Sequence, residues 1–474
     1  MNPTDALFWT MDRIPELRST IGALVLLQRP VSRERMLAEY ARVAARLPRM
    51  RQRVVDVPLG LAPPEWVDDP QFDLEYHLRH IAVPHPGGLP ELLAEIGPLY
   101  ATSLDRDRPL WEAYVAEGLA DGRGAMFVKM HHCLTDGVGG VRLFAELLGS
   151  RVRAEAGAAA PELRPRSTAT AAMLWRALGY NLTETVATGA AVFEVVTDSL
   201  LHPWSTLSSA GRWLQTVTGF GQELTKTRAS SPLHYERSLS RQISTFDMSL
   251  REIEAVCAAL EATNNDIILT IVSGAMHRWH TSRGADVKEL RALVPVNLRR
   301  DDDPAAGNRL ALLAIGLPVG EPNPLRRLRA IQDLMGRVKR DRRASLYPLL
   351  ARVLVAMPMA VAEQVGHQQT MRTNFVCTNV PGPRQACYFG GQLIEAIYPY
   401  APLVGDHPVA VGLMSYQDRV WVGLDVDPLA MGDLQHFRDA LAESYAEVLS
   451  VGRETQRPAP RRRPRARAAA AAQV

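Results

Sequence analysis

The sequence has few of the features that mark a secreted, metal-binding or membrane-spanning chain. Four cysteines stand at positions 133, 257, 377 and 387 without a C-x-x-C pair, so neither a zinc site nor a disulfide framework is expected. No run reaches the roughly 18 to 20 uncharged apolar residues that a transmembrane helix needs. The first residues contain no basic segment followed by an apolar run, so no secretory signal is expected. These absences favour a cytoplasmic protein.

An excess of charge of one sign is also missing. The formal net charge is +3, and six arginines after position 456 account for it, because the remaining chain has 48 basic and 51 acidic residues. Nucleic-acid binding needs a clustered basic surface on the fold, so no nucleic-acid partner is expected. The Arg/Pro/Ala tail over 454–474 has too little apolar content to pack and is predicted to be disordered. It either favours an anionic lipid surface or has no function.

The length of 474 residues suits two domains of roughly 200 residues each. Helical and strand-like patterns alternate, which predicts an α/β fold with mixed sheets in two lobes. We expect an N-terminal lobe over 1–150, a helical linker over 151–240, a C-terminal lobe over 241–453 and the tail over 454–474. The linker contains Trp175, Trp204 and Trp213 among few charges. It is either an amphipathic segment that rests on lipid or a segment whose tryptophans pack across the lobes.

The individual elements follow from apolar periodicity and turn residues. A β-hairpin is predicted over 111–131 around Asp121-Gly122, because an Asp-Gly pair favours a tight turn. Asn264, Asn265 and Asp266 are candidate caps of a helix over 266–282. Further helices are predicted over 33–47, 249–261 and 434–451, and further strands over 21–27, 290–297, 310–319, 373–380, 392–398, 409–416 and 420–426.

The residues best suited to chemistry are His131 and His132, at the end of the second hairpin strand. Successive side chains on a strand point to opposite faces, so one histidine is expected to be chemical and the other structural. A neutral imidazole can accept a proton from a hydroxyl. Asp136 either bonds an imidazole or anchors the turn, and Gly137 permits a close backbone approach.

A histidine pair taken alone also fits two roles outside catalysis. The pair is either a hydrogen-bonded feature of the core or half of a metal site. The nearest other histidines, His77, His80 and His85, do not have the spacing of metal ligands. We therefore expect no metal.

The stretch His131 to Gly137 resembles the HHxxxDG signature of the bacterial wax ester synthase/acyl-CoA:diacylglycerol acyltransferases, within the superfamily that includes condensation domains and chloramphenicol acetyltransferase. Cys133 stands where alanine is common in that family. Further resemblances follow in family order: Pro109-Leu110-Trp111-Glu112 to the PLWE motif, Asn265-Asp266 to the ND motif, then Val294 to Arg299, Gly307-Asn308 and Asn379 to Pro383.

The resemblance implies an O-acyltransferase with a tunnel between its two lobes. His132 would remove the proton from an alcohol, the oxygen would attack the thioester of acyl-CoA, and no acyl-enzyme would form. Asp136 would orient the loop. The implied partners are acyl-CoA and a diacylglycerol or long-chain alcohol, with acyl-CoA as substrate and no cofactor. The resemblance implies a cytoplasmic localisation, or a peripheral one on the inner membrane face or on lipid droplets.

The remaining motif residues each fit two roles. Pro109, Leu110, Trp111 and Glu112 are either architectural, with Trp111 packed and Glu112 paired, or in contact with substrate. Asn265, next to Asp266, either caps its helix or donates to the oxyanion in the tunnel.

Two other functions remain open at this point. One is a lipid-binding or lipid-droplet protein with the same fold and little turnover. The other is an acyltransferase that uses a carrier-protein donor or a different acceptor.

Overall fold

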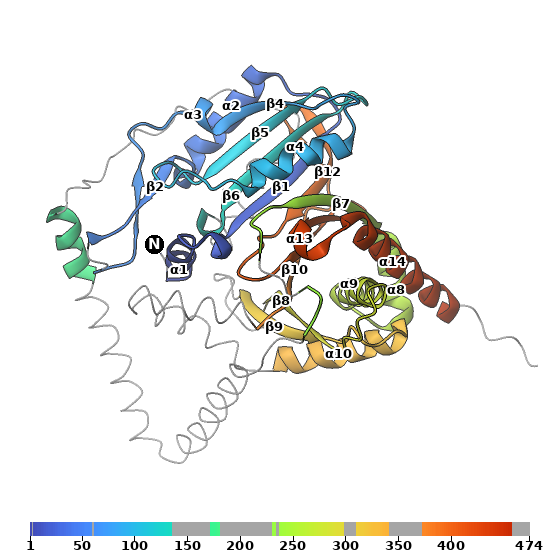
Figure 1. Ribbon diagram of the computed structural model, residues 1–474. Helices are drawn as coiled ribbons and strands as arrows, with labels where there is room; N and C mark the ends of the chain where they lie inside the picture. The colour runs from blue at the N-terminus through green and yellow to red at the C-terminus, as the bar shows by residue number, and fades with distance from the viewer. Residues whose placement is uncertain are drawn as a thin grey trace, which may run out of the picture.

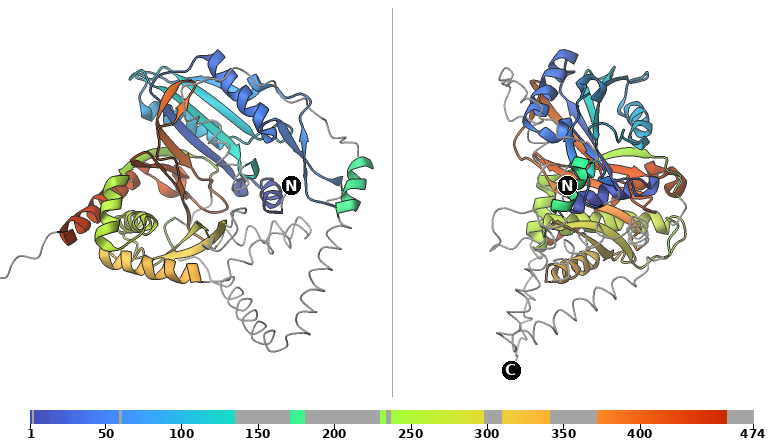
Figure 2. Two further views of the ribbon diagram at one scale, coloured as in Figure 1. Left: turned by 180° about the vertical axis from the view of Figure 1, so that it is seen from behind. Right: turned by 90° about the vertical axis from the view of Figure 1, so that its left-hand side faces the viewer.

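The computed structural model describes residues 1, 3–58, 61–134, 171–180, 230–233, 237–297, 310–340 and 372–456. Two six-stranded sheets form the centres of two lobes, and helices cover them (Figures 1 and 2). The predicted α/β fold with mixed sheets in two lobes is confirmed.

The first lobe is built on the sheet β11-β12-β1-β6-β5-β4. The hairpin β5 (Trp111–Glu117) and β6 (Gly124–His131) is antiparallel, as predicted, and β1 (Thr20–Leu27) pairs with β6. Helix α2 (Arg33–Arg46) packs on one face through Met36 and Tyr40, and α4 (Leu89–Ala101) packs on the other through Leu92 and Ile96. The remaining elements of this half are α1 (Pro3–Met11), η1 (Pro15–Leu17), η2 (Pro48–Arg51), β2 (Gln52–Val55), β3 (Glu65–Asp68), α3 (Leu74–His77) and β4 (Leu78–Ala82).

The second lobe is built on the sheet β7-β14-β13-β10-β8-β9. One face of this sheet is covered by four helices whose apolar side chains form the largest core cluster. The strands are β7 (Gln242–Ser249), β8 (Leu290–Asn297), β9 (Leu310–Leu317), β10 (Phe375–Pro381), β13 (Val409–Tyr416) and β14 (Arg419–Val426). The helices are α8 (Leu250–Leu260), α9 (Asn264–Thr281), α10 (Pro324–Arg340) and α14 (Leu434–Gln456), with the short α13 (Pro428–Met431) before α14.

One hairpin from the second half of the chain belongs to the first sheet. Strands β11 (Tyr388–Phe389) and β12 (Gln392–Tyr400) extend that sheet, because β12 pairs antiparallel with β1. Two paired glycines, Gly412 and Gly423, let β12 pass close to β13 and β14. A Cβ atom on either would lie 2.4 or 2.1 Å from the carbonyl oxygen of Pro399. The assignment of all of 241–453 to a C-terminal lobe is therefore wrong for this hairpin.

Most predicted elements are confirmed to within a few residues, and two details are corrected. Helix α14 continues to Gln456, so the tail predicted from 454 begins inside a helix, and residues 457–474 lie outside the described part. The cap of α9 is Thr263, and Asn264 and Asn265 are its first helical residues. Thr263 is the cap, in place of the predicted residues, because the Asp266 carboxylate accepts hydrogen bonds from the amide and hydroxyl of Thr263, at 3.0 and 2.7 Å.

No single helix in the described ranges is long and apolar enough to cross a membrane. The pair α8 and α9 passes that test only when joined, and the two helices are bent by 103° at the break.

Candidate active site

The two histidines lie where β6 ends, and they differ in burial. Backbone hydrogen bonds fix the point where the strand ends, since the His131 amide donates to the Leu110 carbonyl at 3.0 Å and the His132 amide donates to the Ser19 carbonyl at 2.9 Å. The chain then turns into the 3-10 helix η4 (His132–Leu134). His131 is buried and His132 is half-buried. The expectation that one histidine is chemical and the other structural stays a prediction.

His131 is held by polar groups on both sides of its ring. The amide of Cys133 donates to its Nδ1 at 3.1 Å, and the Cys133 Sγ lies 2.9 Å from the same atom. Because Nδ1 accepts the amide hydrogen, the ring proton belongs on Nε2, which lies 3.2 Å from Oδ1 of Asp12. The other Asp12 oxygen lies 3.3 Å from the Arg106 guanidinium. These contacts suit a structural role for His131.

His132 has the properties of a neutral base. Burial, and after it the neighbouring His131, lower the pKa of His132 to about 4, against the smaller effect of a hydrogen bond with its own backbone. A neutral imidazole carries one ring proton and keeps one basic nitrogen, which can accept the proton of a hydroxyl. The ring of Phe8 packs against the imidazole with 4.4 Å between centroids and a tilt of 32°.

Helix α1 covers this site, and its role was not predicted from the sequence. Asp5, Phe8, Trp9 and Asp12 recur at helical spacing, and Asp5 and Trp9 are buried. The Arg106 guanidinium lies 3.4 Å from the centre of the Trp9 ring, and Trp9 Nε1 donates to Asp56 at 2.8 Å. The spacing of these four residues was the available signal. The residues that α1 contacts are far away in sequence, so the spacing alone could not show what the helix covers.

The PLWE-like residues lie directly beside the histidines. Pro109, Leu110, Trp111 and Glu112 are all buried. The Trp111 indole stacks on Tyr40 at 5.3 Å and on His77 at 4.6 Å, and donates to the carbonyl of Met50 at 2.9 Å. The packing of Trp111 supports the architectural role, and the substrate-contact role stays a prediction. The motif positions the start of β5, where the Leu110 carbonyl accepts the hydrogen bond of the His131 amide.

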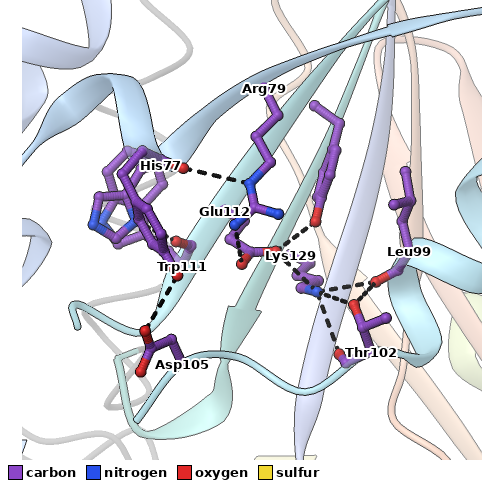
Figure 3. A network of polar contacts seen from close by, with 10 residues as sticks. His77, Arg79, Leu99, Thr102, Asp105, Trp111, Glu112 and Lys129 are labelled. Atoms are coloured by element: carbon purple, nitrogen blue, oxygen red, sulfur yellow. Dashed lines mark hydrogen bonds and ion pairs between the residues drawn. The ribbon is translucent and has the colours of Figure 1, made fainter. Parts of the chain in front are cut away.

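Glu112 is paired, as predicted, in a buried network (Figure 3). Its carboxylate lies 2.9 Å from Nζ of Lys129 and 3.2 Å from Arg79, and accepts a hydrogen bond from the Tyr114 hydroxyl. Lys129 also donates to the Thr102 hydroxyl at 2.8 Å. Burial alone would raise the pKa of Glu112, but Lys129 and the hydrogen bonds lower it below its ordinary value. A buried charge pair of this kind needs such complete hydrogen bonding.

The remaining predicted site residues are Asp136, Gly137, Asn265 and Asp266. Asp136 and Gly137 lie outside the described residues. Asp266 is engaged in the cap of α9, and α9 packs with α8, α10 and α14 in the second lobe. The oxyanion role of Asn265 stays a prediction.

Metal-ligating side chains do not cluster in the described part of the chain, where no three His, Cys, Asp or Glu residues gather in a way that could hold an ion. Residues 135–170 contribute nothing to this statement, because they lie outside the described part. The expectations of no metal and no cofactor therefore remain predictions.

A cavity of about 400 Å³ opens between β2, β3 and the helical segment 171–180. Arg49, Glu65, Trp66, Arg176 and Tyr180 are among its lining residues, and His132 is not. The acyl-transfer chemistry expected of His132 is thus not located in that cavity.

Two family profiles match the chain. The wax ester synthase/diacylglycerol acyltransferase catalytic domain matches residues 1–268, and the WS/DGAT C-terminal domain matches residues 306–448. The chain belongs to the wax ester synthase/diacylglycerol acyltransferase family. It is an acyltransferase, and the resemblance seen in its motifs is confirmed.

Relatives in this family cover most of the chain. A putative diacylglycerol O-acyltransferase from Mycobacterium tuberculosis is 29% identical over 460 residues, which is 95% of this chain and 92% of the relative. The O-acyltransferase WSD from Acinetobacter baylyi is 29% identical over 390 residues, 80% of this chain and 81% of that one.

Solved structures share the fold. The wax ester synthase/diacylglycerol acyltransferase from Marinobacter aquaeolei superposes with a TM-score of 0.64 at 25% identity, covering 95% of this chain and 99% of that chain. The first condensation domain of the calcium-dependent antibiotic synthetase gives 0.60 at 14% identity, with 95% of each chain covered. The second likeness concerns the fold alone.

Proposed function

We propose that this protein transfers a long acyl chain from acyl-CoA to the hydroxyl of a diacylglycerol or a long-chain alcohol, with His132 as the general base. The family match supports acyl transfer to an alcohol. The observation that supports the base is the state of His132: it is half-buried beside the Phe8 ring, and burial lowers its pKa.

In the proposed reaction, the basic ring nitrogen of His132 takes the proton of the alcohol while the alcohol oxygen attacks the thioester carbon. The resulting oxyanion collapses, the C–S bond breaks, and the sulfur leaves with the proton returned by the same nitrogen. The products are an ester and CoA thiol, and the histidine ends as it began. A neutral imidazole is required at the start because the protonated ring cannot accept a proton.

We propose that donor and acceptor reach His132 through a tunnel between the lobes. Such an enclosure would hold two reactants in line and keep water from hydrolysing the thioester. Helix α1 supports this proposal because Phe8 and Trp9 pack against the two histidines and shield them from solvent.

We also propose that the protein meets its substrates at a lipid surface, either a membrane face or a lipid droplet. The support is an apolar patch on the segment 171–180 and its surroundings: Trp175 is 75% exposed, Leu178 51%, Leu61 46% and Tyr180 39%. The buried side of this helix packs Met173 and Ala177 against Val57. Its sequence contains no acid, its one cation, Arg176, is ion-paired with Glu65 at 2.8 Å, and exposed Trp, Tyr and Leu side chains suit a lipid interface. Trp175 therefore does not pack across the lobes, and Trp204 and Trp213 lie outside the described residues.

The test is CoA-thiol release from palmitoyl-CoA with hexadecanol or dioleoylglycerol as acceptor. We expect acceptor-dependent release by the wild type and a loss of at least about a hundredfold in His132→Ala. His277→Ala, which removes a half-buried histidine from α9 in the second lobe, is the matched control and should keep full activity.

Different results would identify the alternative functions. Lipid association that survives His132→Ala, without CoA release by any variant, would mark a lipid-binding protein. Activity with an acyl-phosphopantetheine protein and none with palmitoyl-CoA would mark a carrier-dependent acyltransferase. A folded His132→Ala variant with most of its activity would remove His132 from the mechanism.

A further inference from the structure

The inner face of α1 places one aromatic side chain directly beside the candidate base. Phe8 and His132 are both half-buried, so each keeps part of its surface open. Their ring centroids are 4.4 Å apart with a tilt of 32°, which is a packed contact between the faces of the two rings. Phe8 therefore forms part of the wall beside the imidazole of His132.

The position of Phe8 is fixed by its neighbours on the helix. Trp9 is tied by its indole to Asp56 at 2.8 Å and lies under the Arg106 guanidinium. One turn after Phe8, Asp12 is tied to His131 and Arg106 at 3.2 and 3.3 Å. These contacts hold α1 against η4 and keep the Phe8 ring beside His132.

We infer that Phe8 is a specificity-determining residue that selects the acceptor by the crowding around its hydroxyl. This inference rests on the proposed function. A proton acceptor must lie about 2.6 to 3.2 Å from the hydroxyl oxygen. The first carbons of the alcohol therefore lie closer to the imidazole than any other part of the acceptor, and they meet the ring that packs against it. An unbranched alcohol passes the phenyl ring and gains apolar contact with it, whereas in a 1,2-diacylglycerol the ester-bearing carbon, which adjoins the carbon that carries the hydroxyl, crowds the ring.

The consequence is a dependence of acceptor preference on the size of residue 8. Loss of the ring removes apolar contact with the first methylenes of hexadecanol, and one or two such contacts are worth about tenfold in kcat/KM. The same loss relieves crowding at the glyceride hydroxyl. The ratio of kcat/KM for hexadecanol to that for dioleoylglycerol should therefore fall about tenfold in Phe8→Ala and less in Phe8→Leu.

The experiment measures CoA release by wild type, Phe8→Ala and Phe8→Leu with both acceptors at a fixed concentration of palmitoyl-CoA. The matched control is Phe72→Ala, since Phe72 also stacks on a histidine, His77, at 5.5 Å between centroids and 27°. That variant should keep the acceptor ratio of the wild type. Phe8→Leu keeps an apolar side chain and serves if Phe8→Ala does not fold, as judged by thermal unfolding.

Each result decides the inference. A shift of the ratio by about tenfold in Phe8→Ala, with an unchanged ratio in Phe72→Ala, supports it. An equal loss with both acceptors means that Phe8 only supports His132 and overturns it, as does a ratio within about twofold of the wild type. If the wild type itself releases no CoA with either alcohol, the proposed function fails and the inference falls with it.

Discussion

At the scale of single residues, two adjacent histidines acquire different properties from their surroundings. His131 lies between a backbone amide and the Asp12 carboxylate, which fixes its ring. His132 packs against Phe8, and burial is the largest influence on its pKa. A carboxylate against the His132 ring would instead raise that pKa and hold the proton, which would reduce the value of the imidazole as a base.

The pH dependence of the reaction follows from this difference. With a pKa of about 4, His132 stays neutral from neutral pH down to about pH 5.5, and the rate falls only as the pH decreases through about 4. A histidine of ordinary pKa, about 6.5, would be roughly nine-tenths protonated at about pH 5.5. We therefore expect kcat/KM for CoA release at about pH 5.5 to be within about twofold of its value at about pH 7.5.

The measurement is the initial rate between about pH 5 and 8, with circular dichroism at each pH to confirm the fold. A loss of about tenfold at about pH 5.5 in folded protein would show that the imidazole titrates normally and that burial does not set its basicity.

The roles of these single residues could be predicted from the sequence only in part. The strand pattern of 125–131 and the position of His131 and His132 at its end are local features, so they could be predicted. The roles of Asp12 and Phe8 depend on contacts across more than a hundred positions. Lys129 is equally hidden, because a lysine on a strand is usually exposed, and only the fold supplies Glu112 and the Thr102 hydroxyl to bury it.

At the scale of elements, β12 joins the two lobes. It belongs to the second half of the chain, crosses β13 and β14 at Gly412 and Gly423, and pairs with β1 of the first half. Its apolar pattern identified a strand in the sequence, whereas its partner could not be predicted, because either sheet would accept such a strand. This is why the predicted boundary of the second lobe was wrong for residues 388–400.

A Gly423→Ala substitution tests the importance of this crossing. The new Cβ would lie 2.1 Å from the Pro399 carbonyl oxygen, so the strands must move apart, which costs about 1–3 kcal/mol of the free energy of unfolding. We expect urea denaturation to show this loss. Gly179→Ala is the control, since a Cβ there meets no atom within 4 Å and alanine at this helical position should be neutral or stabilise by up to about 1 kcal/mol. Equal effects of both changes would mean that the close approach at Gly423 is not important for stability.

At the scale of the whole molecule, exposed apolar side chains are unevenly distributed. Among the described residues, four of the five large exposed hydrophobic side chains lie on or beside the segment 171–180, and the fifth, Leu429, is 63% exposed in the second lobe. The segment lies at the same end of the molecule as the N-terminal helix α1 (Figures 1 and 2). A lipid surface at this patch would lie near the helix that covers the candidate base.

Replacement of Trp175 by serine should weaken binding to lipid. Burial of an aromatic side chain of this size contributes about 1.5–3 kcal/mol, so cosedimentation with phosphatidylcholine–phosphatidylglycerol vesicles should fall at least about tenfold. Leu429→Ser removes an exposed hydrophobic side chain outside the patch and should bind vesicles like the wild type. Equal binding by all three proteins would show that the patch does not meet the lipid.

The exchange of β12 between lobes also has a consequence for synthesis on the ribosome. Strand β1 emerges first and finds β6 once residue 131 has been made, but its other neighbour, β12, is complete only at Tyr400. At about 5–20 residues per second, the unpaired edge of β1 stays open for roughly 15 to 50 seconds. An apolar strand edge left open for that time can pair with other nascent chains. We therefore expect the yield of folded protein to depend on chaperones that bind the nascent chain before its last quarter is made.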